Sequence, residues 1–210
     1  MSNSPRFAAI ILAAGASSRM GRDKALLPWN GTTFLGATVD RLITFAHSVI
    51  VVAGANEVAL RAELVSSAGA GVNLRVNSRP EEGQFSSLRI GLQEALNRGC
   101  NAALVALVDR PPAMASTIQQ LIQAFRPGAG AKLSHWAVVP EFHGKHGHPI
   151  VVGAEMIDCF LKAGSAATAR EVEHANQDRI RYLAVDDANV VANVNTPEEF
   201  ERLRKQSIKS

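Results

Sequence analysis

The sequence predicts an α/β fold in which helices cover both faces of an open, mostly parallel sheet. Apolar runs rich in Val and Ile recur along residues 7–140, and the segments between them have the periodicity of amphipathic helices. Several runs are apolar at nearly every position, as expected for strands buried on both faces. Strands that alternate with helices imply right-handed crossovers and a sheet sandwiched by helices.

The elements of the first half follow this alternation in order. Strands are expected at residues 7–13, 48–54, 73–77, 102–109 and 136–140, and helices at residues 33–46, 56–68, 86–98 and 114–125. The Pro- and Gly-containing residues 126–135 are expected to form a loop.

The second half is less regular. A strand and a helix are expected within residues 148–161, a helix at 169–176, a strand at 179–185 and a last helix at 196–206. Thr196 would be the N-cap of that helix and Pro197 its first residue. We therefore expect one domain over residues 1–210.

The composition excludes several classes of protein. The chain has 210 residues, 5% aromatic residues, a net charge of +3 and no long Lys/Arg run, which argues against a nucleic-acid groove. Cys100 and Cys159 lack the spacing of a zinc site or a disulfide framework, so a reducing, cytoplasmic location is expected. The longest apolar run, residues 7–16, is about half of a membrane span. A secretory signal is the alternative for this run, but one Arg precedes it and its core is short.

The segment "AAGASSRMGRDK" (13–24) follows the first strand, and ligands of parallel sheets bind beyond the carboxyl ends of the strands. Small residues let a ligand approach the backbone, and Gly15 and Gly21 permit tight turns. Arg19 and Lys24 could then bind an anion of several charges, such as a triphosphate. The spacing fits neither a Walker A loop nor G-x-G-x-x-G. A solvated connection with incidental charges is the alternative.

Three further segments carry candidate site residues. Asp109 ends the fourth strand, where it could bind Mg²⁺ or cap a turn before two prolines. "GQFSS" (83–87) could cap a helix or present hydroxyl and amide groups to a base. "HGKHGH" (143–148) could bind a metal through three histidines, or form a mobile basic loop that faces an acidic substrate.

Several motifs together resemble those of the MobA-like nucleotidyltransferases, in particular the molybdenum cofactor cytidylyltransferases. They are "LAAGASSRMGRDKALLPW" (12–29), "GQFSSLRIGL" (83–92), "LVDRPP" (107–112), "GHP" (147–149) and "NVNTPEEF" (193–200), in the family's order. The resemblance spans residues 7 to about 203. It implies a Rossmann-like three-layer α/β/α fold of the nucleotide-diphospho-sugar transferase type. An NTP-binding half would cover about residues 7–112 and an acceptor-binding half about residues 113–205.

The resemblance also implies the reaction and its residues. CMP would pass from CTP to the phosphate of a molybdopterin-type acceptor, with release of pyrophosphate, and the product would go to a molybdoenzyme. Arg19, Lys24 and Asp109 would be catalytic, and Asp109 would bind Mg²⁺ with Asn193. The implied nucleotide contacts are Leu12, Ala13, Ala14, Gly15, Arg19, Lys24, Gly83, Gln84, Ser86 and Ser87, and the implied acceptor contacts are His148, Pro149 and Arg170.

Three positions depart from the family pattern. Asn193 stands where an acid is usual, Arg110 where Gln usually follows the metal-binding Asp, and Ser165 where the acceptor half has an acid. These changes leave other readings open: guanylyl transfer, transfer to a sugar or alcohol phosphate, or a cofactor-binding and delivery module with little turnover. A flavin or NAD oxidoreductase lacks support, because the Rossmann glycines and the ribose-binding acid are missing.

Overall fold

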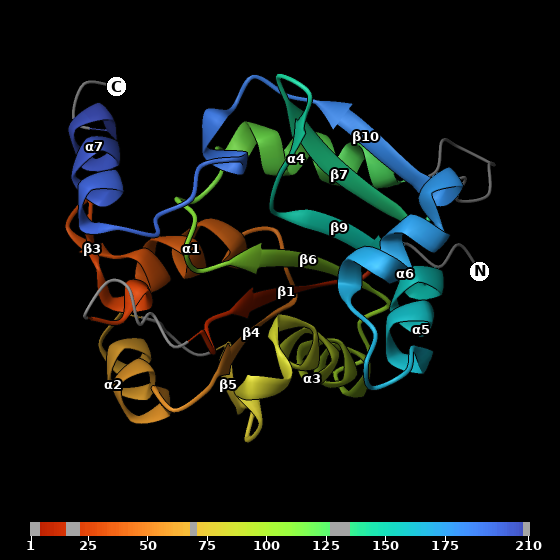
Figure 1. The fold of residues 1–210 in the computed structure, drawn as a ribbon, viewed down its shortest axis with the longest axis horizontal. Helices are drawn as coiled ribbons and strands as arrows, with labels where there is room; N and C mark the ends of the chain where they lie inside the picture. The colour runs from red at the N-terminus through yellow and green to blue at the C-terminus, as the bar shows by residue number, and fades with distance from the viewer. Residues whose placement is uncertain (1–4, 16–21, 68–70, 127–134, 208–210) are drawn as a thin grey trace.

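The computed structural model describes residues 5–15, 22–67, 71–126 and 135–207. An eight-stranded sheet crosses the molecule in the order β10-β7-β9-β6-β1-β4-β5, with β8 paired to β7 (Figure 1). Its strands are β1 (Phe7–Leu12), β4 (Ser48–Ala53), β5 (Val72–Val76), β6 (Ala102–Leu107), β7 (Ala137–Phe142), β8 (Lys145–His146), β9 (Ile150–Gly153) and β10 (Ile180–Ala184). The helices are α1 (Phe34–Ile43), α2 (Glu57–Ser67), α3 (Gln84–Asn97), α4 (Ala115–Phe125), α5 (Ala154–Lys162), α6 (Ala169–Ala175) and α7 (Pro197–Ser207).

The sheet is parallel except around β9 and β8. β1 pairs in parallel with β4 and β6, β4 with β5, and β7 with β10. β9 is antiparallel to both β6 and β7, so its amino end lies beside the carboxyl end of β6. The residues that precede β9 therefore reach the edge of the sheet at which β1, β4 and β6 end.

Helices cover both faces of the sheet, and each face has its own buried core. On one face Leu35, Leu60 and Ile118, from α1, α2 and α4, pack against alternate residues of the strands. On the other face Leu92 of α3 and Phe160 of α5 pack against the intervening strand residues. Each such apolar side chain contributes roughly 1.5–3 kcal/mol on burial. The predicted three-layer, mostly parallel fold is confirmed.

A smaller aromatic cluster fixes the C-terminal helix beside the start of α1. Trp29 of the β2–β3 hairpin (β2 Pro28–Trp29, β3 Thr32–Thr33) packs against Phe34, with ring centroids 4.9 Å apart. The ring centroids of Phe200 in α7 and Phe34 are 6.0 Å apart, and Val194 is fully buried in the same cluster. The chain just before α7 is thereby returned to the edge of the sheet where β1 ends.

The elements agree with the prediction to within a few residues, apart from short ones. The hairpin β2–β3, strand β8 and the 3-10 helices η2 (Lys24–Leu26), η3 (Pro80–Glu82), η4 (Gln177–Arg179) and η5 (Ala188–Val190) were not predicted. The loop expected at residues 126–135 falls mostly outside the described residues. No helix in the described ranges is both long and apolar enough to cross a membrane.

Candidate active site

The loops that follow β1, β4 and β6 meet because these strands are parallel, hydrogen-bonded neighbours. Leu12 lies beside Val52 of β4, and β1 is also in register with β6. The pairing continues past the strand ends, since the Ala13 amide donates to the Val52 carbonyl at 2.9 Å and the Val108 amide to the Leu12 carbonyl at 3.2 Å. The small-residue loop and Asp109 therefore leave the same edge of the sheet.

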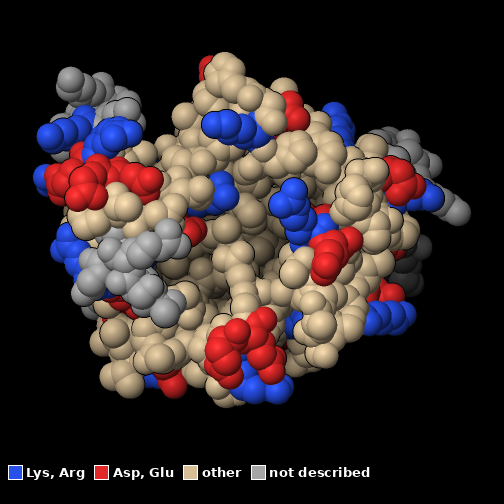
Figure 2. Space-filling view, in the orientation of Figure 1, with Lys and Arg blue, Asp and Glu red and all other residues tan. Residues whose placement is uncertain are grey.

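A pocket of about 80 Å³ lies between the loop after β1 and the start of α3. It is lined by Leu12, Ala14, Gly15, Pro80, Gly83, Gln84 and Ser87. All of these except Pro80 are residues for which the family resemblance implies a nucleotide contact, and the fold brings them together from two segments about 70 residues apart. Ala13 is buried in the core beneath the loop. Figure 2 shows a hollow near the centre of this face, with Lys and Arg side chains along its upper rim.

Gly83 makes the turn from which α3 begins. Its φ of 92° lies in the left-handed region, which glycine adopts without strain. This turn ends η3 and starts α3 at the next residue, so the first N–H groups of α3 lie at the pocket. Unpaired N–H groups at a helix N-terminus favour anionic or electron-rich ligands.

Gly54 and Asn56, which follow β4, hold the loop after β1 in place. A Cβ on Gly54 would lie 2.9 Å from the Ala14 carbonyl oxygen, so the close approach of the two loops requires glycine. Asn56 Nδ2 donates to the Ala13 carbonyl at 2.9 Å and to Asp23 at 2.5 Å. Neither residue was predicted from the sequence, although a Gly directly after a buried strand was an available signal.

Asn77, which follows β5, is a third residue that was not predicted. It is 3% exposed, and its Nδ2 donates to the hydroxyl oxygens of Ser86 and Ser87 at 2.8 and 2.9 Å. Its Oδ1 accepts from the Arg79 amide at 2.9 Å. Asn77 thereby links the two serines to the loop that carries η3. Ser86 also donates to the Gly83 carbonyl, as a residue near the start of a helix commonly does.

Lys24 lies between Asp109 and Asn195. Its Nζ is 2.9 Å from Asn195 Oδ1 and 3.8 Å from Asp109 Oδ2. The side chain of Lys24 is 15% exposed, and Asp23 caps η2 directly before it. Three segments far apart in the sequence therefore place a cation and two oxygen-bearing side chains within contact distance.

The residues at Asp109 suit a divalent cation with oxygen ligands. Asp109 Oδ1 is buried and has no hydrogen-bond partner within the described part of the chain, so its lone pairs are available. Asn195 Oδ1, which accepts a hydrogen bond from Lys24, is a second oxygen at this place. The described residues contain no group of three or more His, Cys, Asp or Glu side chains that could hold a metal. One carboxylate and one amide oxygen are a set that suits Mg²⁺, which commonly takes one or two carboxylates together with substrate phosphates.

The segment before α7 presents Asn195 rather than Asn193 to Lys24. The Val194 amide donates to the Asp109 carbonyl at 2.9 Å, which fixes this segment against the end of β6. Asn193 is exposed, whereas Asn195 is partly buried and bonded to Lys24. The metal-binding role of Asn193 stays a prediction, and the geometry favours Asn195 for it. In an extended segment residues two apart point the same way, so alternation could not distinguish Asn193 from Asn195 in the sequence.

Asp187 is a structural residue. It is 3% exposed and accepts from the Met114 amide at 2.7 Å and from the Thr117 hydroxyl at 2.9 Å, so it caps the start of α4. It also accepts from the Asn189 amide at the start of η5. These contacts use its oxygens within the fold and leave Asp109 as the carboxylate available at the site.

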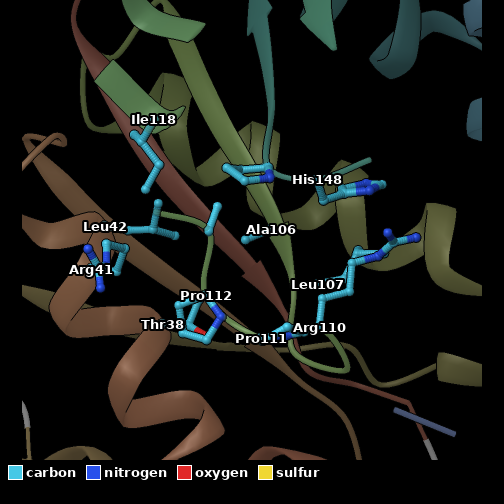
Figure 3. A pocket seen from close by; sticks show the side chains of 12 residues that line it. Thr38, Arg41, Leu42, Ala106, Leu107, Arg110, Pro111, Pro112, Ile118 and His148 are labelled. Atoms are coloured by element: carbon cyan, nitrogen blue, oxygen red, sulfur yellow. The ribbon is translucent and has the colours of Figure 1, made fainter. Parts of the chain in front are cut away.

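Arg110 and His148 meet at the carbonyl of Val190. Arg110 Nη1 and the His148 amide donate to this oxygen at 2.7 and 2.9 Å. They line a small pocket of about 20 Å³, where Figure 3 shows the guanidinium and the imidazole on one side and Leu42 and Ile118 on the other. Burial lowers the pKa of His148 to about 3, and the charge of Arg110 adds to this effect. His148 is therefore neutral at pH 7.

Gly147 allows this arrangement. A Cβ at Gly147 would lie 2.3 Å from the Val190 carbonyl oxygen and 2.7 Å from its carbon, so the loop before β9 can approach η5 only with glycine there. Pro149 is buried beside His148 in the same pocket. The "GHP" segment thus lies next to the Asp109–Arg110 loop, on the side of β6 away from β1.

The remaining predicted residues are dispersed or not described. Arg170 is exposed on α6, and Arg19 lies outside the described residues. His143 and His146 are exposed on the β7–β8 hairpin, while Nδ1 of His148 is buried. The expected alternative of a three-histidine metal site is wrong, since these residues form no metal-ligating group. Whether the hairpin acts as a basic loop stays a prediction.

Comparison with known proteins shows the family to which this site belongs. The family model of the MobA-like NTP transferase domain matches residues 9–180. A nicotine blue oxidoreductase of Paenarthrobacter nicotinovorans is 31% identical over 95% of this chain and 97% of its own. A probable molybdenum cofactor guanylyltransferase of Rhodopirellula baltica is also 31% identical, over 93% of this chain and 90% of its own.

A molybdenum cofactor cytidylyltransferase of Escherichia coli K12 is 23% identical over 91% of this chain and 92% of its own. The crystal structure of Rv0371c from Mycobacterium tuberculosis H37Rv superposes with a TM-score of 0.80 and 26% identity, covering 97% of this chain and 99% of that one. The match of the family model over most of the chain, with relatives of similar length, shows that the chain belongs to the MobA-like NTP transferase family of nucleotidyltransferases.

Proposed function

We propose that the chain transfers CMP from CTP to the phosphate of a molybdopterin-type acceptor and releases pyrophosphate. The observation that carries the proposal is the convergence of Lys24, Asp109 and Asn195 at the edge of the sheet that also holds the pocket between β1 and α3. A cation and oxygen ligands beside a pocket lined by backbone and small side chains suit a nucleoside triphosphate.

The chemistry requires no nucleophile from the protein. An oxygen of the acceptor phosphate attacks the α-phosphorus of the NTP, and the bond to the β-phosphate oxygen breaks as pyrophosphate leaves. Lys24 neutralises charge on the phosphates, and the loop after β1 positions them. Asp109 and Asn195 would hold Mg²⁺, which when bound neutralises further charge on the leaving pyrophosphate. His148 and Pro149 would border the acceptor.

The base and the acceptor are the finer parts of this proposal. CTP is favoured by the resemblance of the chain's motifs to the cytidylyltransferases, whereas the relative from R. baltica is named as a guanylyltransferase. The relatives from R. baltica and E. coli are both named for the molybdenum cofactor. Their names support a pterin-type acceptor and, beyond it, a molybdoenzyme that takes the product. GTP is therefore the alternative donor.

The test is pyrophosphate release from CTP and from GTP, with molybdopterin cofactor as acceptor, in the presence and absence of Mg²⁺. Asp109→Asn should lower the rate at least about 100-fold, because it removes the charge of the proposed metal ligand. Asp158→Asn is the matched control: Asp158 pairs with Lys162 on the surface of α5, at 2.7 Å, and the variant should keep the rate of the wild type. Unchanged pyrophosphate release in Asp109→Asn would contradict the proposal.

A second candidate is a cofactor-binding and delivery module with little turnover, which Asn193 favours. Asn193→Asp and Asn195→Asp separate the two readings, because each places a negative charge at one of the positions that could complete the metal site. A higher transfer rate in either variant indicates an enzyme weakened at that position. Cofactor binding without transfer in the wild type and in both variants indicates the module.

The name of the relative from P. nicotinovorans favours a third candidate, an oxidoreductase. It is tested on the same protein by following the absorbance of NADH and NADPH with nicotine blue as the electron acceptor. Consumption of either reduced nucleotide, without pyrophosphate release from any NTP, would replace the transferase proposal.

A further inference from the structure

We propose that Asn77 is a positioning residue that sets the direction of the Ser87 hydroxyl, so that this hydroxyl donates a hydrogen bond to the bound nucleoside. The proposal rests on the proposed function in taking a nucleotide as the occupant of the pocket between β1 and α3. It assigns a role to Asn77, which does not line that pocket, and gives Ser87 the role of a hydrogen-bond donor.

The orientation of the Asn77 side-chain amide follows from one backbone contact. The Arg79 N–H, 2.9 Å from the Asn77 side chain, can only donate, so the atom that faces it must be the amide oxygen. The amide nitrogen then has to face Ser86 and Ser87. The Asn77 backbone N–H donates to the Ala53 carbonyl at 2.8 Å, which anchors the residue beside the end of β4.

The hydrogens of the two serines can then be accounted for. The two Nδ2 hydrogens of Asn77 go to the Ser86 and Ser87 oxygens, so both hydroxyls act as acceptors toward Asn77. Each hydroxyl has a single hydrogen to donate elsewhere. Ser86 donates its hydrogen to the Gly83 carbonyl at 2.8 Å. Among the described residues, no acceptor takes the hydrogen of Ser87.

The Ser87 hydrogen is therefore available to the pocket that Ser87 lines. Ser87 is 2% exposed, so without a ligand its hydrogen has little access to water. A buried donor without a partner is unfavourable by about 1–3 kcal/mol in general, so a ligand that supplies an acceptor there is favoured. A nucleoside offers such atoms as a base carbonyl oxygen, an unprotonated ring nitrogen or the ribose 2′-hydroxyl oxygen.

Asn77→Asp tests the proposal, because a carboxylate has the same shape and only accepts. It still accepts from the Arg79 N–H, but both serines must now donate to it, and Ser87 loses its hydrogen to the protein. The Kd for the nucleotide that the wild type binds, CTP or GTP, should rise about tenfold, and KM should rise with little change in kcat. Ser87→Ala should raise the Kd by a similar factor.

The double variant separates positioning from a general structural effect. If Asn77 acts through Ser87, then Asn77→Asp should change the Kd by less than about twofold when Ser87 is already Ala. Asn73→Asp is the matched control on β5, the strand that precedes Asn77, since Asn73 Nδ2 donates to the Ser48 hydroxyl at 3.1 Å near the opposite end of β5. It should lower the Tm and leave the Kd unchanged.

Nucleotide analogues identify the accepting atom and apply even if Asn77→Asp does not fold. A 2′-deoxynucleotide, or a base analogue that lacks one acceptor, should bind wild type and Ser87→Ala equally well if the missing atom is the partner of Ser87. Independent effects of Ser87→Ala and of every analogue would overturn the proposal, as would equal nucleotide affinity of wild type and Asn77→Asp. If the wild type binds no nucleotide, the proposed function falls as well.

Discussion

Gly147→Ala should destabilise the protein by displacing η5 from the loop before β9. The new Cβ would lie 2.3 Å from the Val190 carbonyl oxygen and 2.8 Å from its Cβ, and neither atom is the end of a flexible side chain. To remove this steric clash η5 must move. The movement breaks the hydrogen bonds that the Val190 carbonyl accepts from the His148 amide and from Arg110.

The size of the effect follows from these contacts. A neutral hydrogen bond contributes about 1 kcal/mol and one from a charged donor about 1.5–3 kcal/mol, and overpacking adds about 1–3 kcal/mol if the chain moves only in part. We expect the free energy of unfolding to fall by about 4 kcal/mol. For a chain of 210 residues this lowers the Tm by roughly 8–16 °C.

Scanning calorimetry of wild type and variant measures this directly. Gly164→Ala is the matched control, because a Cβ at Gly164 meets no atom within 4 Å and its φ is not in the left-handed region. Its Tm should stay within about 2 °C of the wild type. A Gly147→Ala variant with the same Tm as the wild type would refute the reasoning, since it would show that η5 and the loop before β9 are not in close contact in solution.

Two further predictions concern the same edge of the sheet. Burial holds the pKa of His148 at about 3, against 6.5 for the free side chain, so below pH 6.5 the unfolded chain binds a proton that the folded chain does not. The free energy of unfolding should therefore fall by up to about 2 kcal/mol between pH 7 and pH 5, and urea titrations of His148→Gln should show a smaller fall; equal pH dependence in the two proteins would contradict the burial of Nδ1. Gly54→Ala should push the loop after β1 into the neighbouring pocket, because the new Cβ would lie 2.9 Å from the Ala14 carbonyl. We expect nucleotide affinity to fall roughly tenfold by calorimetric titration, with Gly164→Ala as the control, and an unchanged affinity would mean that the two loops can separate without cost.

The sequence predicts most of the fold because its strands are short, apolar and separated by clear helical periods. β1 and β4 are buried at every position, and such runs leave little doubt about strand identity. Strand order and direction depend on contacts across the sheet, and for that reason the reversal of β9 was not visible in "HPIVV". The short hairpin at Trp29 is defined by its packing on Phe34 and lacks a strong local pattern.

The candidate site was predictable where loops directly follow strands, and less so where one residue acts through another. Gly15, Gly83 and Ser87 were found because small and polar residues stand at such junctions. Asn77 was missed because its importance lies in hydrogen bonds to residues 9 and 10 positions away, which depend on how β5 and α3 pack. Asn195 was missed because it lies two residues from Asn193, and which of the two contacts Lys24 depends on how Val194 is anchored to Asp109.

The reversal of β9 has a consequence for how this fold can diversify. The hairpin between β7 and β9 has both ends fixed by strand pairing, at Val138 with Val151 and at Ala137 with Val152. Its exposed tip at His143 and Gly144 can therefore change in length or sequence while the paired strands keep the core intact. The loops that follow β1 and β5 belong to different strands and need not change with it. The exposed tip of this hairpin can thus diversify independently of the pocket between β1 and α3.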